Sequence, residues 1–281
     1  MTALFRFFSR WPLWLLHSLG AILGWVAFAL SPTYRRRFLA NSALAGYSFS
    51  QVRAAVAHAG RMVAELPRLW FGAPPPLIWE RAELLDAACA RRRGIVFLTP
   101  HLGCFEVTAQ GFADRYSSDH GPIVVLYRPP RHPAMARVLE GARERPGLET
   151  APTTLSGVRQ MIKALRAGRA VGLLPDQVPP EGMGQWAPFF GQAAYTMTLG
   201  ARLALQTGAT VLLVWGERLP WGRGFCLRFR ELAQPLSDCQ EQAVVQINQA
   251  MERLIRECPQ QYLWGYGRYK QPRRDPVKES G

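Results

Sequence analysis

The sequence predicts an α/β protein, with a single mixed sheet flanked by helices and an N-terminal membrane-associated helix. Three features support this prediction. Short apolar runs at residues 95–98, 123–127 and 170–174 have the length of buried strands. Helical patterns lie between these runs, and such alternation is typical of α/β sheets. Residues 11–30 form a nearly unbroken apolar run, which as a helix is about 30 Å long and could cross a bilayer.

Composition restricts the partners of the chain. Lys and Arg number 34 against 20 Asp and Glu, which gives a formal charge of +14. This excess favours nucleic acid, anionic lipid or an acidic protein as partner. Nine tryptophans, many of them near arginines, favour a membrane interface. Because there is no zinc-ligand spacing, RNP-like motif or helix-turn-helix pattern, we expect anionic membrane lipids, no nucleic acid and no metal site.

The cysteines indicate reduced thiols. They are scattered and odd in number, unlike a disulfide framework, and this is typical of a cytosolic compartment. The five are Cys89, Cys104, Cys226, Cys239 and Cys258.

The apolar run at residues 11–30 is expected to attach the chain to a membrane. It is too long for a cleaved signal peptide, and no small-residue cleavage site follows it. Arginines lie on both sides, so the run gives no clear orientation. The pattern fits a helix that spans the bilayer, a helix in the interface with Trp11, Trp14 and Trp25 as anchors, or a buried core helix.

Two helical stretches precede the first strand. Residues 50–66 form an amphipathic helix that Ser50 caps and Pro67 ends, and residues 77–90 form a second one. The regions expected are a membrane-anchoring helix at 1–33, a helical layer at 34–92, an α/β domain at 93–270 and a flexible basic tail at 271–281.

The turn after the first strand holds the main catalytic candidates. Residues 94–106 read GIVFLTPHLGCFE, and open α/β sheets carry their chemistry where buried strands end. His101 suits proton transfer near neutral pH, and a carboxylate on its far ring nitrogen, here expected to be Glu106, fixes the tautomer. No activated serine or cysteine accompanies the pair, although Cys104 lies in the turn. We therefore expect the base to activate a hydroxyl of the substrate.

Two further strands end in candidate binding residues. Arg128 follows the run at 123–127, and its guanidinium suits a phosphate or a carboxylate. Asp176 and Gln177 follow the run at 170–174, where the aspartate suits the orientation of a substrate or of a partner side chain. A surface arginine and an ordinary turn aspartate are the alternatives.

The remaining chain is expected to complete the sheet. Residues 178–191 form a long irregular loop whose aromatic side chains either line an apolar groove or pack the loop. The elements expected after it are a helix at 197–206, a strand at 210–215, a half-exposed antiparallel strand at 225–230, and a helix at 238–258 with Ser237 and Gln240 as a capping box.

Five ordered blocks between residues 11 and 274 resemble one family. His101 and Glu106 resemble the H-x4-D/E motif of the glycerolipid, or lysophospholipid, acyltransferase superfamily. Within it, the chain resembles the lipid A secondary acyltransferases, the group with the lauroyl and myristoyl transferases. The blocks are residues 35–41 (RRRFLAN), 101–106 (HLGCFE), 127–133 (YRPPRHP), 175–177 with 189–191 (PDQ and FFG), and 259–270 (PQQYLWGYGRYK).

The resemblance implies transfer of a fatty acyl chain from acyl-carrier protein to a hydroxyl of a lipid A precursor, at the cytoplasmic face of the inner membrane. It implies no cofactor beyond the carrier-protein thioester. In this hypothesis His101 is the general base, Glu106 orients it, and the alkoxide attacks the thioester directly without an acyl-enzyme. Arg128, Asp176 and Gln177 are then substrate-binding residues. The charge of +14 suits both an acidic carrier protein and anionic lipid.

The chain departs from the family pattern at two places. Gly265-Tyr266-Gly267 stands where His or Asn commonly precedes the final arginine, and residues 211–214 lack a proline often found there. The acceptor therefore stays open, and the main alternative is an acyltransferase that acts on a lysophospholipid or an amino-lipid. The intact His101 and Glu106 argue against a non-catalytic membrane-binding protein, and the apolar first helix argues against a nucleic-acid binder.

Overall fold

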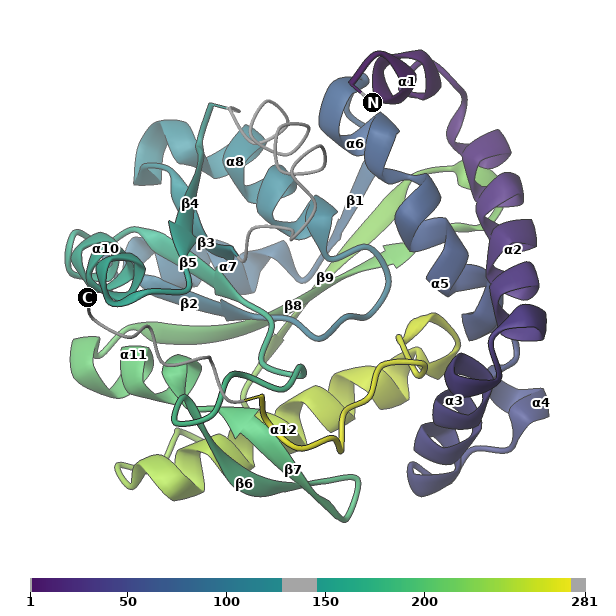
Figure 1. Ribbon diagram of the computed structural model, residues 1–281. Coiled ribbons are helices and arrows are strands. Elements are labelled where there is room, and N and C mark those ends of the chain that lie inside the picture. Colours follow the sequence, from purple (N-terminus) through teal and green to yellow (C-terminus); the bar gives the residue numbers. More distant parts are fainter. Residues whose placement is uncertain (1, 128–145, 274–281) are drawn as a thin grey trace, which may run out of the picture.

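The computed structural model describes residues 2–127 and 146–273. A seven-stranded sheet forms the centre of the molecule (Figure 1). The strand order is β1-β9-β8-β2-β5-β3-β4, and neighbours are parallel except β8 and β9. The mixed sheet and the flanking helices confirm the predicted fold class. The strands are β1 (Leu77–Glu80), β2 (Ile95–Leu98), β3 (Ile123–Tyr127), β4 (Leu148–Pro152), β5 (Ala170–Leu173), β8 (Thr210–Arg218) and β9 (Phe225–Glu231), with β6 (Gly184–Phe189) and β7 (Gln192–Met197) as a separate antiparallel hairpin.

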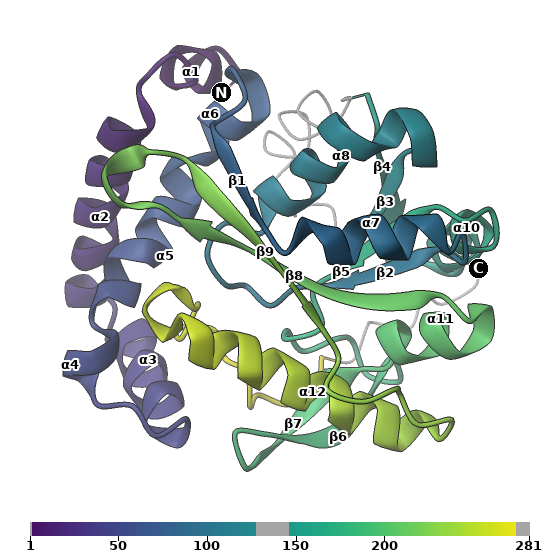
Figure 2. The same cartoon turned by 180° about the vertical axis from the view of Figure 1, so that it is seen from behind.

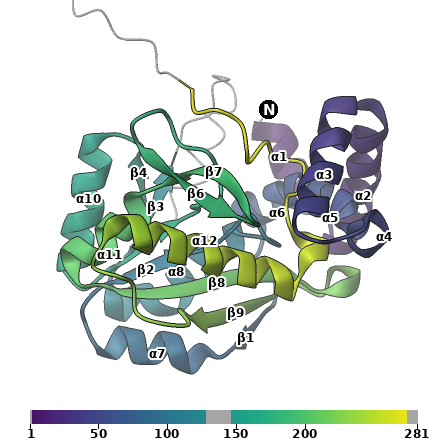
Figure 3. The same cartoon turned by 90° about the horizontal axis from the view of Figure 1, so that it is seen from below.

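Helices cover both faces of the sheet, and the N-terminal ones gather beside one of its edges (Figures 1 and 2). Viewed from below, α7 lies on one face and α12 on the other (Figure 3). The helices are α1 (Thr2–Phe8), α2 (Leu13–Leu30), α3 (Pro32–Leu44), α4 (Phe49–Val52), α5 (Ala54–Ala64), α6 (Leu66–Phe71), α7 (Ala82–Ala90), α8 (Glu106–His120), α10 (Leu155–Arg166), α11 (Leu199–Thr207) and α12 (Gln240–Glu257), with short 3₁₀ turns η1 (Pro220–Gly222) and η2 (Pro259–Gln261).

The central strands send alternate side chains into two cores. On β2, Val96 and Leu98 pack in the core that also holds α10, α11 and α12, whereas Ile95 and Phe97 pack in the core with α7 and α8. Successive side chains of a strand point to opposite faces of the sheet. Because both faces of β2 are buried, the strand appears in the sequence as a continuous apolar run.

Part of the expected helical layer belongs to the sheet. Residues 77–90 were expected to be helical, but Leu77–Glu80 is β1, which pairs with β9, and only Ala82–Ala90 is helical. A four-residue segment is too short to show a period, so its long-range partner decides its conformation. β4 was not expected at all, because its sequence, LETAP, contains no apolar run.

Two expectations for the C-terminal part are also corrected. The expected loop at residues 178–191 contains β6, the first strand of the separate hairpin. α12 begins at Gln240 without a capping box, since Ser237 Oγ accepts the N–H of Cys239 instead of capping the helix. The antiparallel strand expected at 225–230 is confirmed as β9.

A buried charge network ties α2 to the end of α5 and to β8. Arg218 Nη2 lies 2.7 Å from Glu65 Oε1, and Arg218 Nε and His17 Nε2 lie 2.9 and 3.0 Å from Glu65 Oε2. The side chains of His17, Glu65 and Arg218 are only 8%, 1% and 1% exposed. Burial alone would raise the pKa of Glu65, but the charge of Arg218 and these hydrogen bonds lower it to about 2. Glu65 is therefore ionised at neutral pH and holds the N-terminal helices against the sheet.

We expect Arg218→Met to destabilise the protein strongly, because it leaves the Glu65 carboxylate buried without its main partner. Loss of one member of a buried pair typically costs about 3–5 kcal/mol of the free energy of unfolding. The measurement is denaturant unfolding of the detergent-solubilised protein. Glu83→Gln is the control, since its ion pair with Arg81 is exposed and should contribute at most about 1 kcal/mol.

The network should also appear in the pH dependence of stability. The folded pKa of Glu65 lies below its usual value of 4.5, so its contribution is complete above that pH and is lost as the pH falls towards 2. Equal stability of Arg218→Met and Glu83→Gln at neutral pH would show that the network does not hold the helices in place.

Candidate active site

The turn between β2 and α8 carries His101, and backbone hydrogen bonds brace it from the C-terminal segment. The carbonyl of His101 accepts the N–H of Leu263 at 3.1 Å, and the N–H of Gly103 donates to the carbonyl of Gln261 at 3.0 Å. Gly103 has φ +59°, and a Cβ there would strike the carbonyl oxygen of Gly216, so the turn requires glycine. The block at residues 259–264 therefore helps to shape the turn.

Asp176 is the carboxylate bound to the imidazole of His101. Oδ1 of Asp176 lies 2.7 Å from Nδ1 of the ring, and Oδ2 accepts the backbone N–H of His101 at 2.9 Å. The side chain of Asp176 is 2% exposed and that of His101 is 14% exposed. Although burial alone would raise the pKa of Asp176, His101 and, to a lesser degree, Arg268 lower it. An ionised carboxylate only accepts hydrogen bonds, so Nδ1 carries the proton and Nε2 is the basic nitrogen.

The pairing of two neighbouring strands creates this contact. β2 and β5 are parallel neighbours in which Leu98 is paired with Leu173. His101 and Asp176 lie equally far beyond those paired residues, so both side chains emerge at the same edge of the sheet. The sequence placed both residues after strands but could not show that the two strands are adjacent.

Gln177 lies on the other side of the imidazole. Its amide Nε2 is 3.0 Å from Nε2 of His101. Because Nδ1 holds the ring proton, Nε2 accepts a hydrogen bond from this amide. A hydroxyl that donated its proton to Nε2 would have to take the place of this amide. The role of Gln177 as a binding residue stays a prediction.

Glu106 occupies a different place from the one expected. The carboxylate on Nδ1 of His101 is Asp176, whereas Glu106 begins α8, where its Oε2 accepts the indole N–H of Trp70 at 3.4 Å. The N-terminus of a helix favours a negative charge, which suits a carboxylate there. A catalytic role for Glu106 stays a prediction.

Arg128 lies outside the described residues, so its role also stays a prediction. The structure instead places Arg268, from the closing block, deep in the protein. Its guanidinium donates to the carbonyl of Tyr195 at 2.7 Å and to Thr196 Oγ1 at 2.6 Å, and lies 4.9 Å from the ring centre of Phe189. The sequence marked Arg268 through the family resemblance and as a basic residue of a C-terminal segment that either binds anionic headgroups or is solvated, and its burial corrects that second expectation.

Cys104 is unsuited to nucleophilic catalysis. The side chain is buried in the turn, and this burial, followed by the charge of Glu65, raises the pKa of the thiol well above its usual value. The thiol is therefore protonated at neutral pH, as expected for a cysteine that is not activated. Within residues 2–127 and 146–273, no group of three or more His, Cys, Asp or Glu side chains is placed to hold a metal ion.

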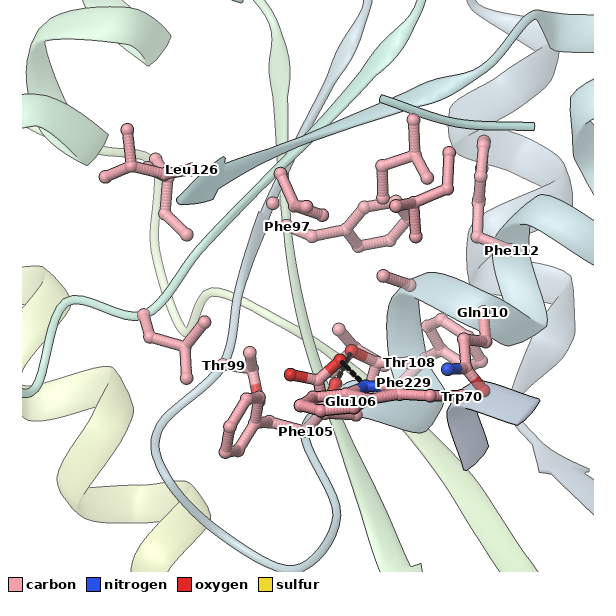
Figure 4. Close-up of a pocket in the computed structure, with 18 residues that line it drawn as sticks. Trp70, Phe97, Thr99, Phe105, Glu106, Thr108, Gln110, Phe112, Leu126 and Phe229 are labelled. Atoms are coloured by element: carbon pink, nitrogen blue, oxygen red, sulfur yellow. Dashed lines mark hydrogen bonds between the residues drawn. The ribbon is translucent and has the colours of Figure 1, made fainter. Parts of the chain in front are cut away.

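An apolar pocket opens beside the turn, between α8 and the sheet (Figure 4). Its cavity volume is about 90 Å³, and it is partly open to solvent. Figure 4 shows Thr99, Phe105 and Glu106 at one end of the lining and Phe97 and Phe112 towards the other. The ring of Phe105 is also 5.0 Å, centre to centre, from the ring of His101. The pocket therefore begins one side chain away from the imidazole.

The sequence is similar to known acyltransferases of bacterial lipid A biosynthesis. Residues 12–271 match the family model described as bacterial lipid A biosynthesis acyltransferase. The chain is 28% identical to a lipid A biosynthesis lauroyltransferase of Escherichia coli (strain K12) over 184 residues, which are 64% of this chain and 58% of that protein. It is also 28% identical, over 214 residues, to a lipid A biosynthesis palmitoleoyltransferase of E. coli and a lipid A biosynthesis acyltransferase of Shigella flexneri, a match that covers 76% of this chain and 65% of each.

These alignments span less than two thirds of the length of each relative. The family model, in contrast, covers nearly all of the described chain, including the turn with His101 and the closing block. The resemblance seen in the sequence is thus confirmed, and the chain belongs to the bacterial lipid A biosynthesis acyltransferase family.

Proposed function

We propose that the protein transfers a fatty acyl chain from an acyl-carrier-protein thioester to a hydroxyl of a lipid A precursor, at the cytoplasmic face of the inner membrane. The observation that carries the proposal is the Asp176–His101 pair, whose imidazole lies against Phe105, a residue that lines an apolar pocket. The similar lauroyltransferase and palmitoleoyltransferase of lipid A biosynthesis suggest the lipid A acceptor. The charge of +14 favours an acidic carrier protein as donor and anionic lipids as surroundings.

The proposed reaction needs one proton carrier and no acyl-enzyme. Nε2 of His101 takes the proton of the acceptor hydroxyl, and the oxygen attacks the carbonyl carbon of the thioester. Backbone N–H groups at the start of α8 stabilise the negative oxygen that forms. The carbon–sulfur bond then breaks, and the leaving thiolate takes the proton from the imidazolium. Asp176 keeps the ring in the required tautomer and stabilises its charged form.

The apolar pocket is the proposed seat of the acyl chain. Its lining is mostly aromatic and aliphatic, and Phe105 connects it to His101. A chain that enters past Phe105 leaves its thioester beside the imidazole. Residues that narrow the pocket should therefore select the length of chain that is transferred.

Ala109 on α8 offers a test of this assignment. We expect Ala109→Leu to fill part of the pocket and to shift the preference towards shorter chains by about tenfold, because it removes room for about two CH₂ groups, each of which contributes about 0.8 kcal/mol when buried. The measurement is competition between two carrier-protein thioesters that differ by four carbons, with the products weighed by mass spectrometry. Ala87→Leu, at an exposed position of α7, is the control. An unchanged product ratio would place the acyl chain elsewhere.

The proposed function itself requires an assay with two acceptors. Protein in detergent micelles is given acyl-carrier-protein thioesters with a Kdo-bearing tetra-acyl lipid A precursor and, separately, with lysophosphatidic acid. We expect one added acyl chain on the lipid A precursor. Acylation of the lysophospholipid alone would retain the chemistry and replace the acceptor, and the absence of product with both would contradict the proposal.

A further inference from the structure

α2 has two different faces. One is buried against the protein and contains Leu13, Leu16, His17, Gly20 and Gly24. The opposite face is apolar and exposed, and its large side chains are Trp14, Ile22, Leu23, Trp25, Val26 and Leu30. α2 is long and apolar enough to cross a membrane by length and composition, yet 33% of it is buried inside the protein. The apolar side chains of α2 therefore contact the protein core on one face and are exposed on the opposite face.

The buried face of α2 is joined to α5 along a seam of glycines. A Cβ on Gly20 would lie 2.7 Å from Cα of Arg61, and a Cβ on Gly24 would strike the carbonyl oxygen of Val56. A Cβ on Gly60 would strike the carbonyl oxygen of Gly20. The two backbones thus touch over more than one turn, and α2 cannot separate from α5 without breaking this contact.

The seam carries charged and polar groups that do not suit the centre of a bilayer. Arg61 Nε donates to the carbonyl of His17 at 3.3 Å, and His17 in turn contacts Glu65. If α2 crossed the membrane, α5 and this network would enter the hydrocarbon with it. Charged side chains at the centre of a bilayer cost at least about 2.5 kcal/mol each. The composition of α2 is compatible with a spanning helix, but its packing against α5 and the charged network argues against one.

A second apolar feature lies beside the first turn of α2. The tip of the β8–β9 hairpin packs there, because a Cβ on Gly222 would strike the backbone nitrogen of Trp14. Figures 1 and 2 both show the hairpin reaching α2. The tip presents Trp221, which is 88% exposed and has φ +61°, a conformation that a bulky side chain rarely adopts. An exposed indole at such a position suits the boundary between water and lipid.

The charge around these apolar groups matches an anionic surface. The sequence contains no Asp or Glu before Glu65, which is itself buried. The exposed arginines of the N-terminal helices and of the hairpin are Arg6, Arg10, Arg36, Arg37, Arg53 and Arg223. Basic side chains next to an apolar face are the pattern of helices that lie in the interface of anionic membranes.

We propose that α2 lies in the plane of the membrane interface instead of crossing it, and that the tip of the β8–β9 hairpin inserts beside it through Trp221. The partner is the surface of a bilayer that contains anionic lipid. The inference rests on the proposed membrane location but not on acyl transfer, so its tests use topology and lipid binding, and an inactive preparation does not affect them.

The first test determines on which side of the membrane each end of α2 lies. Single cysteines replace Thr2 or Thr33, both exposed, in a Cys239→Ser background, and sealed inverted inner-membrane vesicles are treated with a membrane-impermeant maleimide. In a separate sample that keeps Cys239, this residue, the exposed cysteine among the five, reports the side of the α/β domain. We expect both positions and Cys239 to react before detergent is added. Reaction of only one position, or of neither, would overturn the in-plane arrangement.

The second test addresses the hairpin. Trp221→Asn removes the indole while retaining a residue that tolerates positive φ. Trp186→Thr is the control, because Trp186 is also exposed (48%) but belongs to β6, a strand that does not adjoin α2 in Figure 1. We expect Trp221→Asn to weaken binding to vesicles with one third phosphatidylglycerol by about tenfold, as for one partly inserted aromatic side chain. Equal binding of the two variants, with equal thermal unfolding, would overturn the proposed insertion.

Discussion

His101→Ala should reduce acyl transfer by about 10²–10⁴-fold, the range that a positioned general base contributes. The variant loses the only ring nitrogen that the geometry presents as a base, since Nδ1 is engaged by Asp176 and Nε2 faces the position of Gln177. The loss should be in the rate of the chemical step, because the proposed seat of the acyl chain is the apolar pocket, whose lining does not include His101. The measurement is single-turnover transfer from a labelled carrier-protein thioester.

His120→Ala is the matched control for this prediction. His120 lies in the last turn of α8, at the opposite end of the helix from the catalytic turn, so it should retain normal transfer. Both variants should show the same thermal unfolding as the parent protein within a few degrees. Turnover of His101→Ala within threefold of His120→Ala would rule out His101 as the base.

Asp176→Asn should cause a loss of similar size, about 10²–10⁴-fold, although it changes only one atom. The amide of asparagine can donate to Nδ1, and the ring then carries its proton on Nε2, where it cannot accept the proton of the acceptor. Because the defect is the wrong tautomer and not the wrong charge, raising the pH should not restore the rate. The pH profile of single-turnover transfer, measured from about pH 6 to pH 9, distinguishes this from simple loss of stability.

Double variants in the His101→Ala background compare Asp176 with Glu106, the residue to which the sequence assigned the orienting role. If Asp176 holds the ring, adding Asp176→Asn to His101→Ala should cause almost no further loss of rate, since residues that act as a unit are not additive. Adding Glu106→Gln to His101→Ala should then still lower the rate if Glu106 acts on the substrate or the pocket. A strong further loss from Asp176→Asn in the His101→Ala background would show that Asp176 does not act through His101.

The central strands could be predicted from the sequence because the segments with apolar runs are also the segments buried in the structure. β2 and β5 are buried on both faces, so their apolar runs stand out, and each is followed by polar residues at the edge where the sheet carries its site. The run of β3 stands out because its first two residues, Ile123 and Val124, are buried in the two different cores. β1 was expected to be helical and β4 was not expected, because neither strand has a continuous buried apolar run. They are short, partly exposed edge strands that owe their conformation to pairing with β9 and β3.

The sequence by itself determined that this is an α/β protein with a histidine and an aspartate at the ends of two buried strands, and its ordered motifs determined the family. Only the tertiary structure decided that these two strands are neighbours, so that Asp176, and not the nearby Glu106, binds Nδ1 of His101. It also decided that one face of α2 packs on α5, which hydropathy cannot reveal because a protein core and a lipid bilayer favour the same apolar residues. Both features depend on contacts between residues far apart in the chain, and no local pattern records such contacts.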